Sequence, residues 1–72
     1  MIADIRQRLN ALPFEPFFVV TSGGTRYRVA SAEHAGTNPQ GNRVMIWFDD
    51  GSGVDVAGLH IVAIERDAPQ AA

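Results

Sequence analysis

The sequence contains no cysteine and no lysine, and it has only two histidines. Without cysteine the chain forms no disulfide and no thiolate metal site. His34 and His60 are too few to build a structural zinc site without carboxylate ligands. We therefore expect no metal and no cofactor. A domain this small must then be stabilised by good packing or by self-association.

Positive charge and long apolar runs are also scarce. Six arginines stand against eight acidic residues, which gives a formal net charge of −2 at pH 7, whereas nucleic-acid-binding domains are usually basic. No apolar run approaches the ~20 residues that a helix needs to cross a bilayer. Residues 1–6 lack the basic-then-apolar layout of a secretion signal. These features predict a cytoplasmic protein with no membrane partner.

The first dozen residues predict a helix. Ile2, Ile5, Leu9 and Leu12 are spaced three, four and three apart, which places them on one stripe of a helix. Pro13 should end this helix, because a proline disfavours helical geometry in the preceding residue. So short a helix is unstable alone in water, and its apolar stripe must therefore pack on a sheet.

The stretch from Pro13 to Val29 predicts a proline-marked connector followed by a β-hairpin. Strands at 17–22 and 25–30 flank Gly23-Gly24, and a Gly-Gly pair is a typical two-residue hairpin loop. In this register one face is apolar and should face the core; it comprises Phe18, Val20, Tyr27 and Val29. The opposite face comprises Phe17, Val19, Thr21, Arg26 and Arg28.

The second half of the chain predicts a loop and three more strands. Residues 31–42 have a loop composition, in which Ser31 can cap a single helical turn. Strands are expected at 43–49, 53–57 and 59–65, with turn chemistry at Asp50-Gly51-Ser52. The core face of the first two should comprise Val44, Ile46, Phe48, Val54 and Val56. Their opposite face should comprise Met45, Trp47 and Asp55.

One helix followed by five antiparallel strands predicts a mainly β domain, α+β by content, over residues 1–67. Its architecture should be a strongly bent five-stranded sheet or a small SH3-like or Sm-like barrel, since closure removes exposed edges. An open α+β sheet with the helix across one face is the alternative. Residues 68–72 should form a flexible tail.

The pattern of the chain resembles a group of short uncharacterised bacterial proteins. The residues that carry the resemblance are Pro13-Phe14-Glu15-Pro16-Phe17, Gly24 before Tyr27-Arg28-Val29, Glu33-His34 and 59–65. The resemblance implies a helix, a Pro-Phe-x-Pro-Phe entry and a small barrel, and it implies no activity. The similarity to Sm-like RNA binders rests on element order alone.

Catalytic chemistry has little support in the sequence. Ser31 or Ser52 can be combined with His34 or His60 and an acidic residue into a triad, but no nucleophile-elbow motif accompanies them. The Asp49-Asp50 pair lacks the ligand spacing of a calcium loop. We therefore expect no catalytic residues and a non-enzymatic protein.

Two binding functions fit the pattern. Large apolar side chains that face away from the core predict a protein interface, through self-association or a protein partner; its candidate residues are Phe17, Val19, Met45 and Trp47. The second hypothesis is single-stranded nucleic-acid binding, because arginines beside aromatic residues suit that task; its candidate residues are Arg26, Arg28 and Arg43. The interface is the stronger prediction, with a homo-oligomer formed through edge strands.

Overall fold

The computed structural model describes residues 1–67. It contains one α-helix, α1 (Ile2–Leu9), and two 3-10 turns, η1 (Ala32–His34) and η2 (Gly58–His60). The strands are β1 (Phe17–Thr21), β2 (Arg26–Val29), β3 (Ala35–Thr37), β4 (Arg43–Trp47), β5 (Gly53–Ala57) and β6 (Ile61–Arg66). The tail expected at 68–72 lies outside the described residues. Across residues 1–67, the helices are too short or too polar to cross a membrane.

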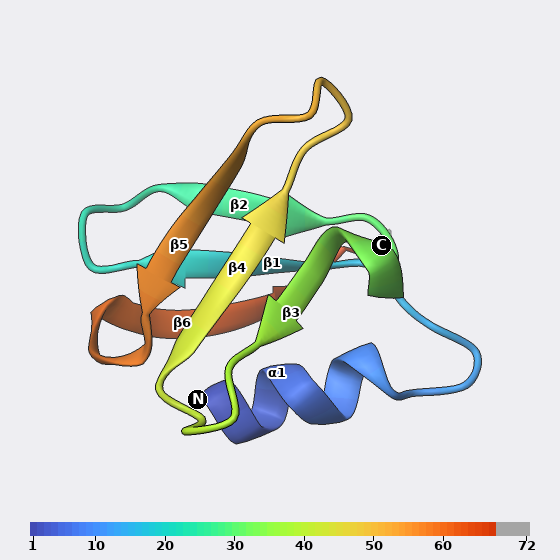
Figure 1. Cartoon of the computed structure of the whole chain (residues 1–72), viewed down its shortest axis with the longest axis horizontal. Helices are drawn as coiled ribbons and strands as arrows, with labels where there is room; N and C mark the ends of the chain where they lie inside the picture. Colours follow the sequence, from blue (N-terminus) through green and yellow to red (C-terminus); the bar gives the residue numbers. More distant parts are fainter. Residues whose placement is uncertain (68–72) are drawn as a thin grey trace, which may run out of the picture.

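The strands form two three-stranded antiparallel sheets, ordered β2–β1–β6 and β3–β4–β5. The second sheet lies in front of the first, its strands cross those behind at a steep angle, and α1 runs along one side (Figure 1). The helix and the mainly β antiparallel class are confirmed. The expected closed barrel is not formed, and the strands do not make one five-stranded sheet.

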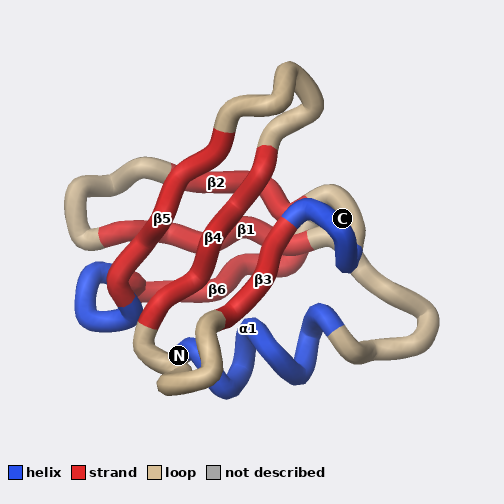
Figure 2. Tube along the Cα trace, in the orientation of Figure 1, coloured by secondary structure: helices blue, strands red, loops and turns tan. Residues whose placement is uncertain are grey.

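The two sheets separate at the 3-10 turns. Figure 2 shows η1 between β2 and β3, and η2 between β5 and β6, which are the two places where the chain passes from one sheet to the other. Each turn redirects the backbone before the next strand begins. Consecutive strands across these turns therefore do not pair, and the sheets pack face to face.

The core lies between the two sheets and α1. Its buried residues are all apolar: Ile2, Ile5, Phe17, Val19, Val29, Ala35, Val44, Ile46, Val56 and Ile61. The helix buries Ile2 and Ile5 of the expected stripe, and Leu9 packs against the core partly buried. Because α1 ends at Leu9, before Pro13, the prediction for Leu12 is wrong: it lies outside the helix and is 95% exposed. Arg6 fixes α1 to the end of β3, because its guanidinium donates to Thr37 Oγ1 and to the carbonyl of Asn38, both at 3.0 Å.

The β1–β2 hairpin has a register one residue away from the expected one. Phe17 pairs with Val29 and Val19 with Tyr27. The N–H of Thr21 donates to the carbonyl of Thr25 at 2.9 Å, so the loop has three residues and its last, Gly24, adopts φ +88°. A one-residue shift reverses the face of every side chain on a strand. The prediction that Phe18 and Val20 face the core, with Phe17 and Val19 outside, is therefore wrong.

The β4–β5 hairpin keeps its expected faces. Its register differs from the expected one by two residues, with Val44 opposite Val56 and Ile46 opposite Val54. A shift of two residues preserves the side of the sheet to which each side chain points. The N–H of Phe48 donates to the carbonyl of Ser52 at 2.8 Å, so this loop also has three residues, 49–51, and its last, Gly51, adopts φ +90°.

Strand β3 lies within the segment that was expected to be a loop. Gly36 pairs with Met45 and Thr37 with Val44 at the side of the sheet next to α1. A three-residue strand that contains glycine gives almost no sequence signal. The helical turn before it is confirmed: Ser31 caps η1, and its Oγ accepts from the N–H of Glu33 at 3.2 Å.

Candidate protein interface

The outer face of the β3–β4–β5 sheet carries the single tryptophan of the chain. Along β4 the buried Val44 and Ile46 alternate with Met45 and Trp47, whose side chains therefore point away from the core. The Trp47 side chain is 42% exposed, and Met45 is half-buried. Within residues 1–67 no helix or strand lies in front of this face (Figure 1). Both predicted orientations are correct.

Two glycines shape the surface around these side chains. A Cβ atom added to Gly53 on β5 would lie 2.9 Å from Met45 Cε and 3.2 Å from Trp47 Cδ1. A Cβ atom on Gly36 on β3 would lie 3.6 Å from Cη2 and Cζ3 of Trp47. The indole therefore extends between two strands that present no side chain beside it. The methionine methyl lies over Gly53, toward the outer edge of β5.

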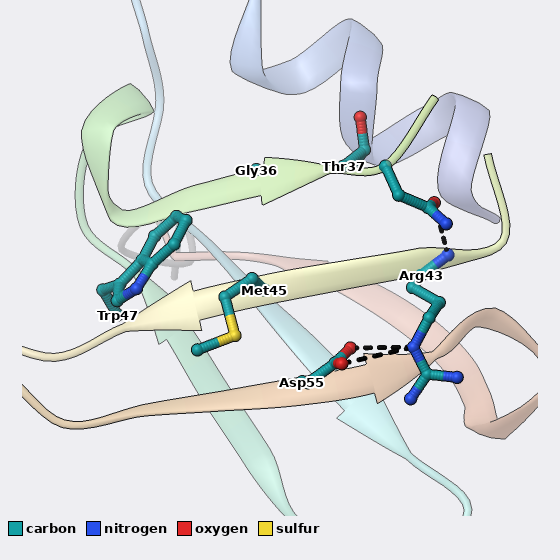
Figure 3. A pocket seen from close by; sticks show the side chains of 7 residues that line it. Gly36, Thr37, Arg43, Met45, Trp47 and Asp55 are labelled. Carbon is teal, nitrogen blue, oxygen red and sulfur yellow. Dashed lines mark hydrogen bonds and ion pairs between the residues drawn. The ribbon is translucent and has the colours of Figure 1, made fainter. Parts of the chain in front are cut away.

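A shallow hollow of about 300 Å³ lies beside these side chains. Figure 3 shows Trp47 and Met45 at one end of it and an ion pair at the other, in which Arg43 Nε lies 3.0 Å from Asp55 Oδ1. Both charged side chains are about half exposed, so their pairing contributes only ~0–1 kcal/mol and is readily exchanged for another partner. We call this surface the Trp47 face; it comprises Gly36, Arg43, Met45, Trp47, Gly53 and Asp55.

The other two residues of the expected interface are not at the surface. Phe17 and Val19 are fully buried, with 0% exposure. They lie on the inner side of β1 because of the three-residue hairpin loop. The prediction that they belong to an exposed interface is wrong, and Met45 and Trp47 alone remain from that set.

The three candidate nucleic-acid residues do not share one surface. Arg26 and Arg28 project from β2 on the outer face of the β2–β1–β6 sheet, beside Phe18, whereas Arg43 lies on the Trp47 face. Each arginine is paired with a carboxylate: Arg26 with Glu65 at 2.8 Å, Arg28 with Asp67, and Arg43 with Asp55. A phosphate would have to displace a carboxylate at every one of these positions.

Ser31, His34 and Asp49 come together, as one of the possible triads. Ser31 Oγ lies 2.7 Å from His34 Nδ1, and His34 Nε2 lies 2.8 Å from Asp49 Oδ1. The serine oxygen already accepts the capping N–H of Glu33, and the Asp49 side chain is 93% exposed. The arrangement joins η1 to the β4–β5 loop.

The sequence interpretation missed two exposed apolar residues near η2. Leu59 is 83% exposed and Val62 is 55% exposed, and both belong to the strand that is expected at 59–65. Leu59 lies in η2, directly after β5, and lines a hollow of about 410 Å³ with Met1 and Ala57. The sequence signal for a turn here was the glycine at position 58. In the structure this position leaves little room for a side chain, because a Cβ would lie 3.0 Å from Ile2 Cγ1.

Comparison with known proteins gives no relative. The chain matches no protein-family model, no curated protein and no solved structure.

Proposed function

We propose that this protein is a non-enzymatic binding module that associates with itself, or with a protein partner, through the Trp47 face. The observation that carries the proposal is the 42% exposure of Trp47 beside Met45 on a sheet face that no described element covers. Tryptophan and methionine are enriched at interface cores, and tryptophan is a frequent binding hot spot. A domain of 72 residues without disulfides also gains stability from association.

The test is sedimentation velocity over a wide range of protein concentration. The wild-type protein should show concentration-dependent association, and the double substitution Met45→Ser with Trp47→Ser should abolish it. The matched control is Val62→Ser, which removes a comparably exposed apolar side chain from the other sheet. A wild-type protein that stays monomeric throughout and captures no protein would refute the proposal, as would equal loss of association in the control.

Single-stranded nucleic-acid binding is the second candidate. Its supporting observation is the outer face of the β2–β1–β6 sheet, where the Arg26 guanidinium lies 4.2 Å from the ring centre of Phe18, an arrangement compatible with stacking on bases. The acidic net charge and the pairing of the arginines with carboxylates favour the protein interface over nucleic-acid binding. Fluorescence anisotropy with a labelled oligonucleotide should detect salt-dependent binding that Arg26→Ala and Arg28→Ala remove. Absence of binding at low salt excludes this function.

The cytoplasmic location remains a proposal, and so does the link to the short bacterial proteins, which rests on the Pro-Phe-x-Pro-Phe entry.

A further inference from the structure

Strand β5 is an edge strand with unused backbone groups. In the β4–β5 ladder the N–H of Phe48 bonds to Ser52 and the N–H of Gly58 bonds to Asn42. Because hydrogen-bonded pairs alternate along an antiparallel ladder, Val54 and Val56 also direct their backbone groups toward β4. The N–H and C=O groups of Gly53, Asp55 and Ala57 therefore point away from the sheet. Within residues 1–67 none of them has a backbone partner.

Two of the other sheet edges, β3 and β2, carry more protection than β5 does. Strand β3, at the opposite edge of the same sheet, is held against α1 by Arg6. Strand β2 presents two arginines, and charged side chains are the usual device that keeps an edge from pairing. Strand β5 has a single charge, Asp55, and that charge is already paired with Arg43 on its own sheet.

We propose that β5 pairs with β5 of a second copy of this chain, antiparallel and about a two-fold axis at Val56. The two β3–β4–β5 sheets then become one continuous sheet of six strands. This inference rests on the proposed function and specifies how the copies meet. A two-fold contact is self-complementary, since each edge supplies the same donors and acceptors to the other. Asp55 and Ala57 of each copy exchange about four backbone hydrogen bonds with those of the other.

Charge selects this register from the possible ones. Pairing centred on Asp55 would place the two Asp55 carboxylates directly opposite each other, which is unfavourable. A register centred on Val54 would set each carboxylate opposite Gly53, against the methyl group of Met45. The register centred on Val56 sets Asp55 opposite Ala57 of the second copy. Ala57 is the direct neighbour of Arg43 on β4, so each carboxylate approaches an additional guanidinium.

The same register also serves the apolar residues of the Trp47 face. It brings Leu59 of the second copy toward Gly53. The methyl group of Met45 lies over Gly53, and one edge of the Trp47 indole lies beside it. Leu59 is 83% exposed in the single chain. Leu59 of each copy thus approaches Met45 and Trp47 of the other, and the two-fold axis makes this contact occur twice.

The register is tested with two single-cysteine variants of a chain that has no other cysteine. In the proposed dimer the two copies of residue 56 form a non-hydrogen-bonded pair about 4.5 Å apart at Cα, a spacing that a disulfide fits. Val56→Cys should therefore form a disulfide-linked dimer under mild oxidation. Val54→Cys is the matched control, because its two copies would lie ~13 Å apart and should stay unlinked. Cross-linking through residue 54 instead of 56 overturns the register.

A proline variant tests the backbone pairing without oxidation. Ala57 has φ −70° and ψ 137°, which proline adopts readily, and its outward N–H makes no bond within the sheet. Ala57→Pro should fold like the wild type, as judged by circular dichroism, and sediment as a monomer. Ala57→Ser keeps the N–H and should associate normally. If Ala57→Pro associates like the wild type while the Met45/Trp47 variant does not, edge pairing is refuted and the proposed function stands. A monomeric wild type refutes edge pairing, and it refutes the proposed function only if that monomer also captures no protein partner.

Discussion

Replacing Gly53 by alanine tests the packing of the Trp47 face. The added Cβ would lie 2.8 Å from the carbonyl oxygen of Ile46, 2.9 Å from Met45 Cε and 3.2 Å from Trp47 Cδ1. The first of these atoms belongs to the backbone of β4 and cannot move without disturbing the hairpin. Overpacking of this kind costs about 1–3 kcal/mol, against a gain of about 0.4–1 kcal/mol from the reduced freedom of the unfolded chain.

The net expectation for Gly53→Ala is a loss of about 1–2 kcal/mol in the free energy of unfolding. Urea denaturation followed by circular dichroism would register this as a midpoint about 1–2 M lower, for a denaturant dependence of about 1 kcal/mol per M. The emission of Trp47 should change as well, because the new methyl group displaces the indole. The double variant with Met45→Ala should lose less than the sum of the two single losses, since it removes one of the clashes.

Gly36→Ala is the matched control on the other side of the indole. Its Cβ would lie 3.6 Å from the nearest Trp47 atoms, which is ordinary contact, and its φ is not among the positive ones. The substitution should leave stability unchanged or raise it by up to about 1 kcal/mol. If Gly53→Ala were as stable as Gly36→Ala, Met45 and Trp47 would not pack over Gly53 as described, and the reasoning about this face would be wrong.

Two further predictions concern the hairpins. Phe17→Ala should cost about 3–5 kcal/mol, because it empties a fully buried site, while Phe18→Ala should cost only about 1 kcal/mol; a larger cost for Phe18 would restore the register expected from the sequence. In the β4–β5 loop, the Ser52 hydroxyl donates to Asp50 Oδ1 at 2.6 Å and the Ser52 N–H donates at 2.9 Å, and together they lower the pKa of Asp50 below its ordinary value of 3.8. A lowered folded-state pKa stabilises the protein above pH 3.8, and this stabilisation is lost as the pH falls through the folded-state value. The stability advantage of the wild type over Ser52→Ala, measured by urea denaturation, should therefore shrink between pH 7 and pH 3, and a pH-independent difference would contradict the role of this hydrogen bond.

The sequence predicts those parts of the fold where an alternating or helical pattern allows only one face of the strand or helix to be buried. Strand β5 has its expected bounds, and the polar Asp55 between Val54 and Val56 permits only one inner face. On β4 the sequence Val44-Met45-Ile46-Trp47 is apolar throughout, yet pairing with β5 fixes which residues face inward. Met45 and Trp47 were therefore assigned to the correct side.

The register of β1 was not predictable for a physical reason. Residues 17–20 are four consecutive large apolar residues, so either face of the strand can be buried at similar cost. The decision then falls to the loop, and Ser22-Gly23-Gly24 accommodates a two-residue or a three-residue turn equally well by composition. Strand β3 was not predicted for a different reason. Its pairing with β4 and its contact with α1 are tertiary effects that no local propensity encodes.

The aromatic side chains on the two outer faces of the fold have different surroundings, and this difference favours the Trp47 face as the proposed binding surface. Phe18 has long charged residues directly opposite it on both neighbouring strands, Arg28 and Glu65, and the guanidinium of Arg26 lies over its ring. Trp47 has a glycine opposite it on β5, and the Arg43–Asp55 ion pair lies further along the sheet. The chain thus covers one aromatic ring with its own charges and leaves the other open beside an edge strand. In the proposed dimer, the added strand would give Trp47 the cover that Phe18 receives from within the chain.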